Sequence, residues 1–259
     1  DGADGRVSDG AATTGVAEGD GAGGVARYDV EVVERIERPA DGFTQGFVFD
    51  AEGRLWESTG LVGESSLRRV DPHTGATVER RGIDADEFAE GLAVGPHGLV
   101  QLTWTDGVAY RWSVDPLEQT GEFRYAGEGW GLTFDGESFI QSDGSATLTR
   151  RDTSTFEVVS TVEVRLAGEP VDQLNELEWV NGSVYANVWH SDDIVRIDPS
   201  TGTVTAVIDA SGLWESPART AEMTLNGIAH RPGDPSTRLW LTGKQWPAIF
   251  VVDLQEIEP

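Results

Sequence analysis

The sequence contains no cysteine, few histidines and no long apolar run, and each absence excludes a class of protein or chemistry. Without cysteine there can be no disulfide, thiolate nucleophile or cysteine-type zinc site. No run of about 18 apolar residues is present, so no segment is expected to span a membrane. None of the four histidines has a serine in the pattern of a Ser-His-Asp catalytic triad. No cluster of His, Asp and Glu suggests a metal site. We therefore expect neither triad catalysis, nor a metal, nor a cofactor.

Basic residues are also scarce, and lysine is nearly missing. The chain has 45 acidic and 19 basic residues, a formal net charge of -26, and Lys244 is its only lysine. Such a field repels nucleic acid and anionic membrane surfaces. Adaptation to a high-salt environment explains this excess of acidic residues more simply than an acidic surface that binds a ligand. Because the chain has otherwise lost lysine, Lys244 is a candidate for a role that arginine cannot fill.

Residues 1–26 differ in composition from the rest of the chain. They are rich in Gly, Ala and Asp, with almost no large apolar side chain, and predict a flexible acidic tail. Residues 27–259 are expected to form one folded domain. A polar tail before a compact domain suits an exported protein that is extracellular, periplasmic or tethered to the cell surface through the tail.

Glycine is abundant, with 32 residues, and short apolar runs alternate with turn residues along the chain, which indicates many short strands. Five segments share a common opening: TQGF at 44–47, AEGL at 89–92, GWGL at 129–132, LNEL at 174–177 and LNGI at 225–228. A turn, a second apolar run and a third run ending in aspartate follow each opening. Four strands repeated every 40 or so residues are typical of β-propeller blades, so the sequence predicts an all-β, five-bladed propeller.

The last repeat ends soon after its third strand, at Pro259. Residues 27–38 form a strand-like run that belongs to no repeat of its own. We predict that this N-terminal strand becomes the outer strand of the last blade and closes the ring, which leaves no open sheet edge.

Because first strands line the channel of a propeller, equivalent residues of the repeats should meet at one mouth. The openings contribute one ring of side chains: Gln45, Glu90, Trp130, Asn175 and Asn226. The second strands contribute another: Thr59, Trp104, Asp143, Trp189 and Lys244. Taken singly, each has a structural explanation, since indoles fill cores and amides satisfy turns. Together they predict an apolar pocket for a small neutral group.

Within that pocket the two charged groups suggest acid–base chemistry. Partly desolvated among the indoles, Glu90 should have a raised pKa and could transfer a proton. Lys244 could hold a carbonyl oxygen or stabilise an oxyanion, while Asn175 and Gln45 could orient an amide.

At these residues the chain resembles the bacterial and plant type of glutaminyl cyclase (glutaminyl-peptide cyclotransferase). The resemblance runs from about residue 28 to residue 259. Its motifs include DGFTQGF at 41–47, EGL at 90–92, GWGLTFDG at 129–136, LNELEWVNGSVYANVW at 174–189 and TGKQWP at 242–247. The family has a five-bladed propeller and converts an N-terminal glutamine into pyroglutamate with release of ammonia, without a metal.

The resemblance implies a role for each matching residue. Glu90 is the proton-transferring acid and base, and Lys244, Asn175 and Gln45 polarise the substrate amide. Trp104, Trp130 and Trp189 enclose the glutaminyl side chain. We further expect Asn226 and Asp143 to contact the substrate, a peptide or protein with N-terminal glutamine, and the enzyme to be a monomer.

Two other functions fit a propeller with this mouth. A metal-dependent lactonase would need a carboxylate cluster in the channel, whereas the ring here holds mainly indoles and amides. A non-enzymatic propeller could use the same tryptophans to hold an extended peptide, and would tolerate the change Glu90→Gln.

Overall fold

A computed structural model describes residues 24–258. Every regular element in that range is a strand, which confirms the predicted all-β class, and none of its residues belongs to a helix that could cross a membrane. The predicted tail, residues 1–26, lies almost entirely outside the described residues. Export of the protein stays a prediction.

Three separate four-stranded antiparallel sheets follow one another along the chain. Their strands, in order, are β2 (Thr44–Phe49), β3 (Leu55–Thr59), β4 (Ser66–Val70), β5 (Thr77–Gly82), β6 (Ala89–Gly95), β7 (Gly98–Thr103), β8 (Val108–Val114), β9 (Leu117–Arg124), β10 (Leu132–Phe134), β11 (Phe139–Gln141), β12 (Thr147–Arg151) and β13 (Val158–Glu163).

The remaining long strands form one eight-stranded sheet with the order β16-β17-β18-β19-β1-β22-β21-β20. Its strands are β1 (Ala26–Glu37), β16 (Leu174–Val180), β17 (Ser183–Val188), β18 (Asp193–Ile197), β19 (Val204–Asp209), β20 (Leu225–Ala229), β21 (Arg238–Gly243) and β22 (Ala248–Glu256). The parallel β19–β1 contact divides it into two halves of four strands. A small hairpin, β14 (Arg165–Leu166) with β15 (Glu169–Pro170), precedes it.

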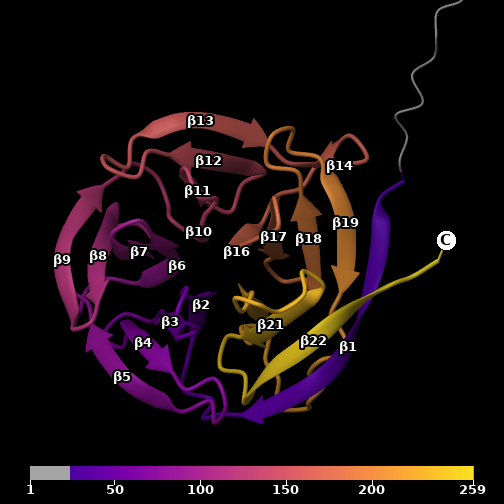
Figure 1. The fold of residues 1–259 in the computed structure, drawn as a ribbon, viewed down its shortest axis with the longest axis horizontal. Coiled ribbons are helices and arrows are strands. Elements are labelled where there is room, and N and C mark those ends of the chain that lie inside the picture. The colour runs from indigo at the N-terminus through magenta and orange to yellow at the C-terminus, as the bar shows by residue number, and fades with distance from the viewer. Residues whose placement is uncertain (1–23, 259) are drawn as a thin grey trace, which may run out of the picture.

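The sheets are arranged around a common centre; β2, β6, β10 and β16, each the first strand of its repeat, lie nearest to it, and β1 lies at the periphery (Figure 1). The innermost strands contact one another in a closed order, β2 with β6, β6 with β10, β10 with β16, β16 with β20 and β20 with β2. All residues of β2 and β20 are buried, whereas β5 and β13 are almost wholly exposed. The first strand of each repeat is therefore the one that can present side chains to the centre.

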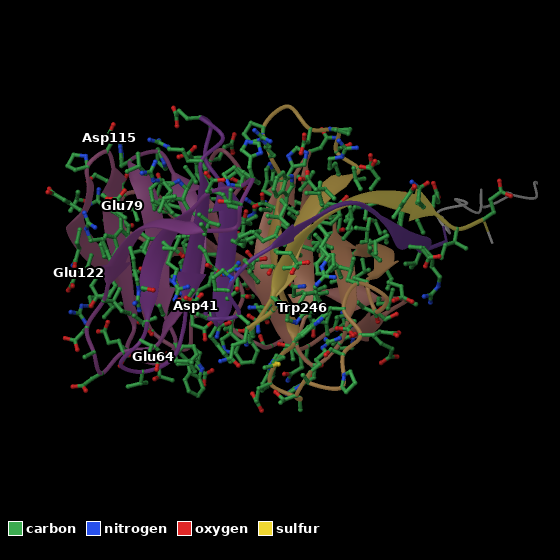
Figure 2. The ribbon with its side chains drawn as sticks, turned by 90° about the horizontal axis from the view of Figure 1, so that it is seen from below. Asp41, Glu64, Glu79, Asp115, Glu122 and Trp246 are labelled. Carbon is green, nitrogen blue, oxygen red and sulfur yellow. The ribbon has the colours of Figure 1, made fainter. Side chains whose placement is uncertain are left out.

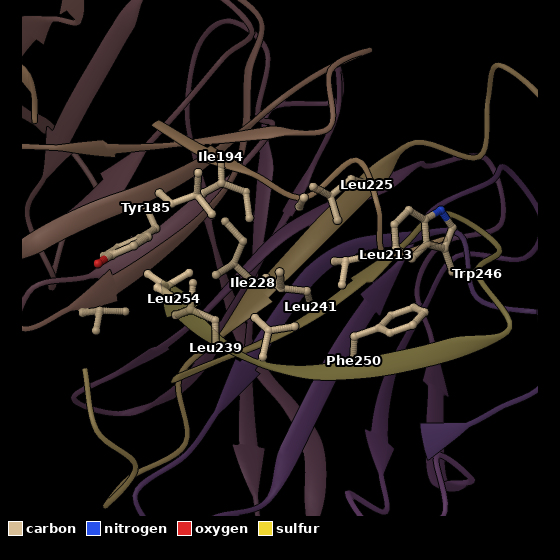
Figure 3. Close-up of a cluster of buried hydrophobic side chains, with 14 of the residues drawn as sticks. Tyr185, Ile194, Leu213, Leu225, Ile228, Leu239, Leu241, Trp246, Phe250 and Leu254 are labelled. Atoms are coloured by element: carbon tan, nitrogen blue, oxygen red, sulfur yellow. The ribbon is translucent and has the colours of Figure 1, made fainter. Parts of the chain in front are cut away.

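Apolar side chains of each sheet pack against those of the next, so that five buried clusters separate the units. The largest joins the two halves of the eight-stranded sheet, where Tyr185 and Ile194 face Ile228, Leu239 and Leu254 (Figure 3). Burying each such side chain contributes about 1.5–3 kcal/mol. The central face is fixed by this packing.

The N-terminal strand β1 completes the unit formed by the C-terminal repeat. It pairs antiparallel with β22 from Tyr28 opposite Glu256 to Glu37 opposite Ala248. At its beginning it also runs parallel to β19. The pairing that the sequence predicts between residues 27–38 and the last repeat is thus present.

Acidic side chains are spread over the molecule. Glu64 and Asp115 lie toward opposite faces in the side view, with Glu79 and Glu122 between them (Figure 2). The negative charge is therefore not confined to one face.

Candidate active site

A cavity of about 290 Å³ opens at the centre of one face. Eleven residues line it: Phe43, Gln45, Leu61, Phe88, Glu90, Trp104, Trp130, Asn175, Trp189, Glu222 and Lys244. Seven of them are residues that the sequence predicts for the site, and they come from five different repeats. The equivalence of the repeats is what brings them together.

Irregular backbone pairing at the starts of the innermost strands sets the direction of several functional side chains. The pairing of the two innermost strands shifts register in four units, between Thr44 and Gly46, Ala89 and Leu92, Leu174 and Leu177, and Leu225 and Ile228. A bulge of this kind redirects a side chain and is common beside active sites. The shifted segments contain Gln45, Glu90, Asn175 and Asn226.

Glu90 is the buried acid of the cavity, with 6% of the residue exposed. Burial raises the pKa of its carboxyl well above the ordinary value, the ammonium of Lys244 opposes this shift, and the carboxylate of Glu128 adds to it. A raised pKa makes a carboxylate a better proton acceptor and suits Glu90 to general acid–base catalysis.

Two side-chain amides fix the Glu90 carboxyl. Gln45 Nε2 donates to Glu90 Oε1 at 3.0 Å, and Asn226 Nδ2 donates to Gln45 Oε1 at 3.0 Å. Asn226 also donates to the carbonyl oxygen of Thr44 at 2.9 Å. Asn226 is 1% exposed and does not line the cavity, so it lies behind Gln45.

Lys244 is held among aromatic rings. Its Nζ lies 5.1 Å from the ring centre of Phe43 and 5.8 Å from that of Trp189, and it forms no salt bridge with any residue from 24 to 258. Burial lowers the pKa of its ammonium, while Glu90 and Glu222 act in the opposite direction. Rings can stabilise a cation without neutralising it, so Lys244 keeps its donors for a ligand.

The three indoles form the apolar walls. Trp130 and Trp189 meet edge to face at 5.4 Å, and Trp104 packs on Phe88 at 6.0 Å. Glu128 Oε2 accepts hydrogen bonds from both Trp104 Nε1, at 2.7 Å, and Trp130 Nε1, at 2.9 Å. One carboxylate oxygen thus fixes two walls.

Asn175 supplies the cavity with a hydrogen-bond acceptor. The residue is 3% exposed, and its Oδ1 has no hydrogen-bond partner among the described residues. A buried acceptor left unpaired costs free energy. A ligand N–H in the cavity would satisfy it.

Like Asn226, a second predicted substrate-binding residue lies outside the lining of the cavity. Asp143 does not line the cavity, and its Oδ1 accepts hydrogen bonds from the backbone N–H, at 3.0 Å, and hydroxyl, at 2.6 Å, of Ser145. The carboxylate shapes its own loop, which is a common role for aspartate in a turn.

Sequence reasoning missed Phe43, Leu61, Phe88 and Glu222 in the lining. Phe43 and Phe88 both stand two positions before a ring residue, Gln45 and Glu90, and Glu128 has the same offset from Trp130. That repeated offset was a usable signal. No group of three or more possible metal ligands occurs within residues 24–258.

Comparison with known proteins identifies the family of this chain. The glutamine cyclotransferase family matches residues 8–254. A glutaminyl-peptide cyclotransferase of Arabidopsis thaliana is 38% identical over 233 residues, which cover 88% of this chain and 72% of the relative. The crystal structure of Myxococcus xanthus glutaminyl cyclase is 40% identical, with a TM-score of 0.81 over 90% of this chain and 99% of that one. The family resemblance noted in the sequence is confirmed, and the chain belongs to the glutamine cyclotransferase family.

Proposed function

We propose that this protein is a glutaminyl-peptide cyclotransferase, which converts the N-terminal glutamine of peptides or proteins into pyroglutamate and releases ammonia. The observation that carries the proposal is the buried Glu90 carboxyl beside Lys244 in an indole-lined cavity. A neutral glutaminyl side chain suits such walls, and the reaction needs one group that moves protons and one that stabilises oxygen.

In the proposed reaction the neutral α-amine attacks the side-chain amide carbon, forming the ring C–N bond. Glu90 accepts the proton that the attacking nitrogen loses and delivers it to the departing nitrogen. The bond to that nitrogen then breaks, and ammonia leaves. Negative charge develops on the amide oxygen during attack, and the ammonium of Lys244 is the donor that would stabilise it.

The two amides have different proposed roles. Gln45 already donates to Glu90 and accepts from Asn226, so we assign it to the orientation of the general acid–base. Asn175, with its unpaired Oδ1, is the group that would receive an N–H of the substrate. The indoles of Trp104, Trp130 and Trp189 would enclose the glutaminyl side chain and exclude water.

The proposal includes the architecture of the catalytic domain. We infer that the four-stranded units are the blades of a five-bladed propeller, closed by β1 in the last blade, and that residues 27–259 form one catalytic domain acting as a monomer. The closed order of contacts among the innermost strands and the clusters between neighbouring sheets support this interpretation.

The direct test measures ammonia released from a short peptide with N-terminal glutamine, with and without a chelator. The same peptide acetylated at its N-terminus is the control, because it has no nucleophilic amine. We expect release only from the free peptide, unchanged by the chelator. The variant Glu90→Gln should fold normally and lose most turnover, since an amide cannot exchange the proton.

Other outcomes would favour one of the two alternative functions, the metal-dependent lactonase or the peptide-binding propeller. Release that stops with chelator would indicate a metal-dependent enzyme. Peptide binding without any ammonia, from protein shown by circular dichroism to be folded, would replace the enzyme with a peptide-binding propeller. Near-normal turnover in folded Glu90→Gln would remove Glu90 from the chemistry.

A further inference from the structure

A second and larger hollow, of about 600 Å³, adjoins the cavity. The two share a wall: Trp189 lines the cavity, and His190, whose ring packs against it at 4.0 Å between ring centres with a tilt of 35°, lines the hollow. On the other side Glu222 lines the cavity, and its neighbour Met223 lines the hollow. The hollow therefore lies directly beside the cavity, within reach of a chain that leaves the cavity on this side.

The hollow has a fixed wall in the segment 211–224, between β19 and β20. Arg219 forms a two-pronged salt bridge with Asp192 and donates through Nε to the carbonyl oxygen of Met223 at 3.0 Å. Its guanidinium also lies 5.2 Å from the ring centre of Trp246, whose Nε1 donates to the same carbonyl at 3.0 Å. These contacts fasten the segment to the body of the protein.

The hollow offers hydrogen-bonding atoms and negative charge. Hydroxyl-bearing residues line much of it, among them Ser191, Ser211 and Thr220. Arg219 neutralises Asp192, but Glu215 and Glu222 form no salt bridge in the part of the chain that the structure describes. The balance of charge around the hollow is negative.

We propose that this hollow binds the second and third residues of a glutaminyl peptide and favours lysine or arginine there. The inference rests on the proposed cyclotransferase function. Once the glutaminyl side chain occupies the cavity, the rest of the peptide must leave on one side. The hollow provides polar walls for its backbone and the unpaired carboxylate of Glu215, and the unpaired carboxylate of Glu222 lies at its border with the cavity, where both could attract a cationic side chain.

The test compares kcat/KM for three substrates at low salt: glutaminamide, which has no second residue, Gln-Ala-Ala-amide and Gln-Lys-Lys-amide. The dilysine peptide should be the best substrate. The variant Glu215→Gln, at an exposed position away from the cavity, should reduce the Lys/Ala ratio by about two- to fivefold, the effect of one exposed ion pair. Its turnover of glutaminamide should not change.

The matched control is Glu118→Gln, which removes the same charge from an exposed position on the outer strand β9. It should leave the Lys/Ala ratio unchanged. An equal fall in both variants would mean that only the overall field acts, and an unselective wild type would also overturn the proposal. If none of the three substrates releases ammonia, the proposed function fails rather than the subsite.

Discussion

At the scale of single residues, Glu90 owes its position to neutral groups. Its hydrogen bond comes from Gln45, which Asn226 holds in turn, and no residue from 24 to 258 forms a salt bridge with it. A salt-bridged carboxylate would have a lowered pKa and would be a poor proton carrier at neutral pH. An amide orients the carboxyl without that penalty.

The pKa shifts predict a bell-shaped dependence of kcat/KM on pH. The rate should rise as Glu90 and the substrate α-amine, with a pKa of about 7.7–8.0, lose their protons. At higher pH the rate should fall again as Lys244 loses its proton. Burial lowers the pKa of that ammonium from its ordinary value of 10.5, so the midpoint of this alkaline limb should lie below pH 10.5. The variant Glu222→Gln removes a charge that favours the ammonium, so its alkaline limb should move to lower pH. An alkaline limb that is unchanged in this variant would contradict the assignment to Lys244.

Glu128 is expected to act through the indoles it holds. Glu128→Ala removes both indole hydrogen bonds and should raise KM by about thirtyfold with a smaller change in kcat, since two bonds of about 1 kcal/mol each amount to about 2 kcal/mol. Glu128→Gln is the matched variant, because one amide oxygen can still accept both N–H groups. Steady-state kinetics on glutaminamide would show this difference. Equal KM values in the two variants would mean that the charge matters and the hydrogen bonds do not.

The sequence predicted the seven ring residues of the cavity because equivalent positions in a repeat occupy equivalent places. It could not place Asp143 and Asn226, which share that register. Whether a polar side chain turns into a cavity, behind another residue or onto its own loop depends on contacts between units. Those contacts are absent from the linear pattern.

At the scale of elements, the start of each innermost strand needs close contact with the next unit. A Cβ added at Gly131 would lie 2.0 Å from the backbone oxygen of Asn175 and 2.9 Å from Leu177 Cγ. The glycine therefore permits neighbouring units to approach at the point where the site residues emerge.

The substitution Gly131→Ala should destabilise the protein by about 1–3 kcal/mol, because the clash is with backbone and has no flexible side chain to absorb it. It should also lower activity by displacing Asn175. Gly121→Ala on β9 is the control, since its nearest neighbour, Arg111 Nη1, is 3.9 Å away. Denaturant unfolding of both variants gives the comparison, and similar midpoints would contradict the role assigned to Gly131.

The repeats in the sequence predicted the positions of most strands, including the N-terminal strand of the last unit. They did not predict the β14–β15 hairpin, because it is a short insertion outside the repeat.

The buried carboxylate of Glu176 is also unexpected, since this residue stands where the other openings carry glycine. Its carboxylate accepts hydrogen bonds from the backbone N–H of Phe47, at 3.1 Å, and of Ile228, at 2.8 Å, and so joins three innermost strands. Such a link depends on a neighbour more than a hundred residues away.

At the scale of the whole molecule, the distribution of acidic groups over both faces predicts that salt stabilises the fold. Repulsion among charges is screened over about 10 Å at 0.1 M salt and about 3 Å at 1 M. The midpoint of thermal unfolding should therefore rise between 0.1 and 2 M KCl. Sucrose, which stabilises proteins without screening charge, is the control. A midpoint that responds to sucrose but not to KCl would argue against adaptation to salt.

The pairing of β1 with β22 has a consequence for synthesis of the protein. Because β22 follows every other described strand in the sequence, β1 must wait until those strands have been synthesised before its antiparallel partner exists. Until then the nascent chain has an unpaired edge on β1, and the edge of β19 is covered only by the short parallel contact. The last step in closing this domain during synthesis should thus be the pairing of its first and its last strand, and the complete ring of side chains around Glu90 would form only at that moment.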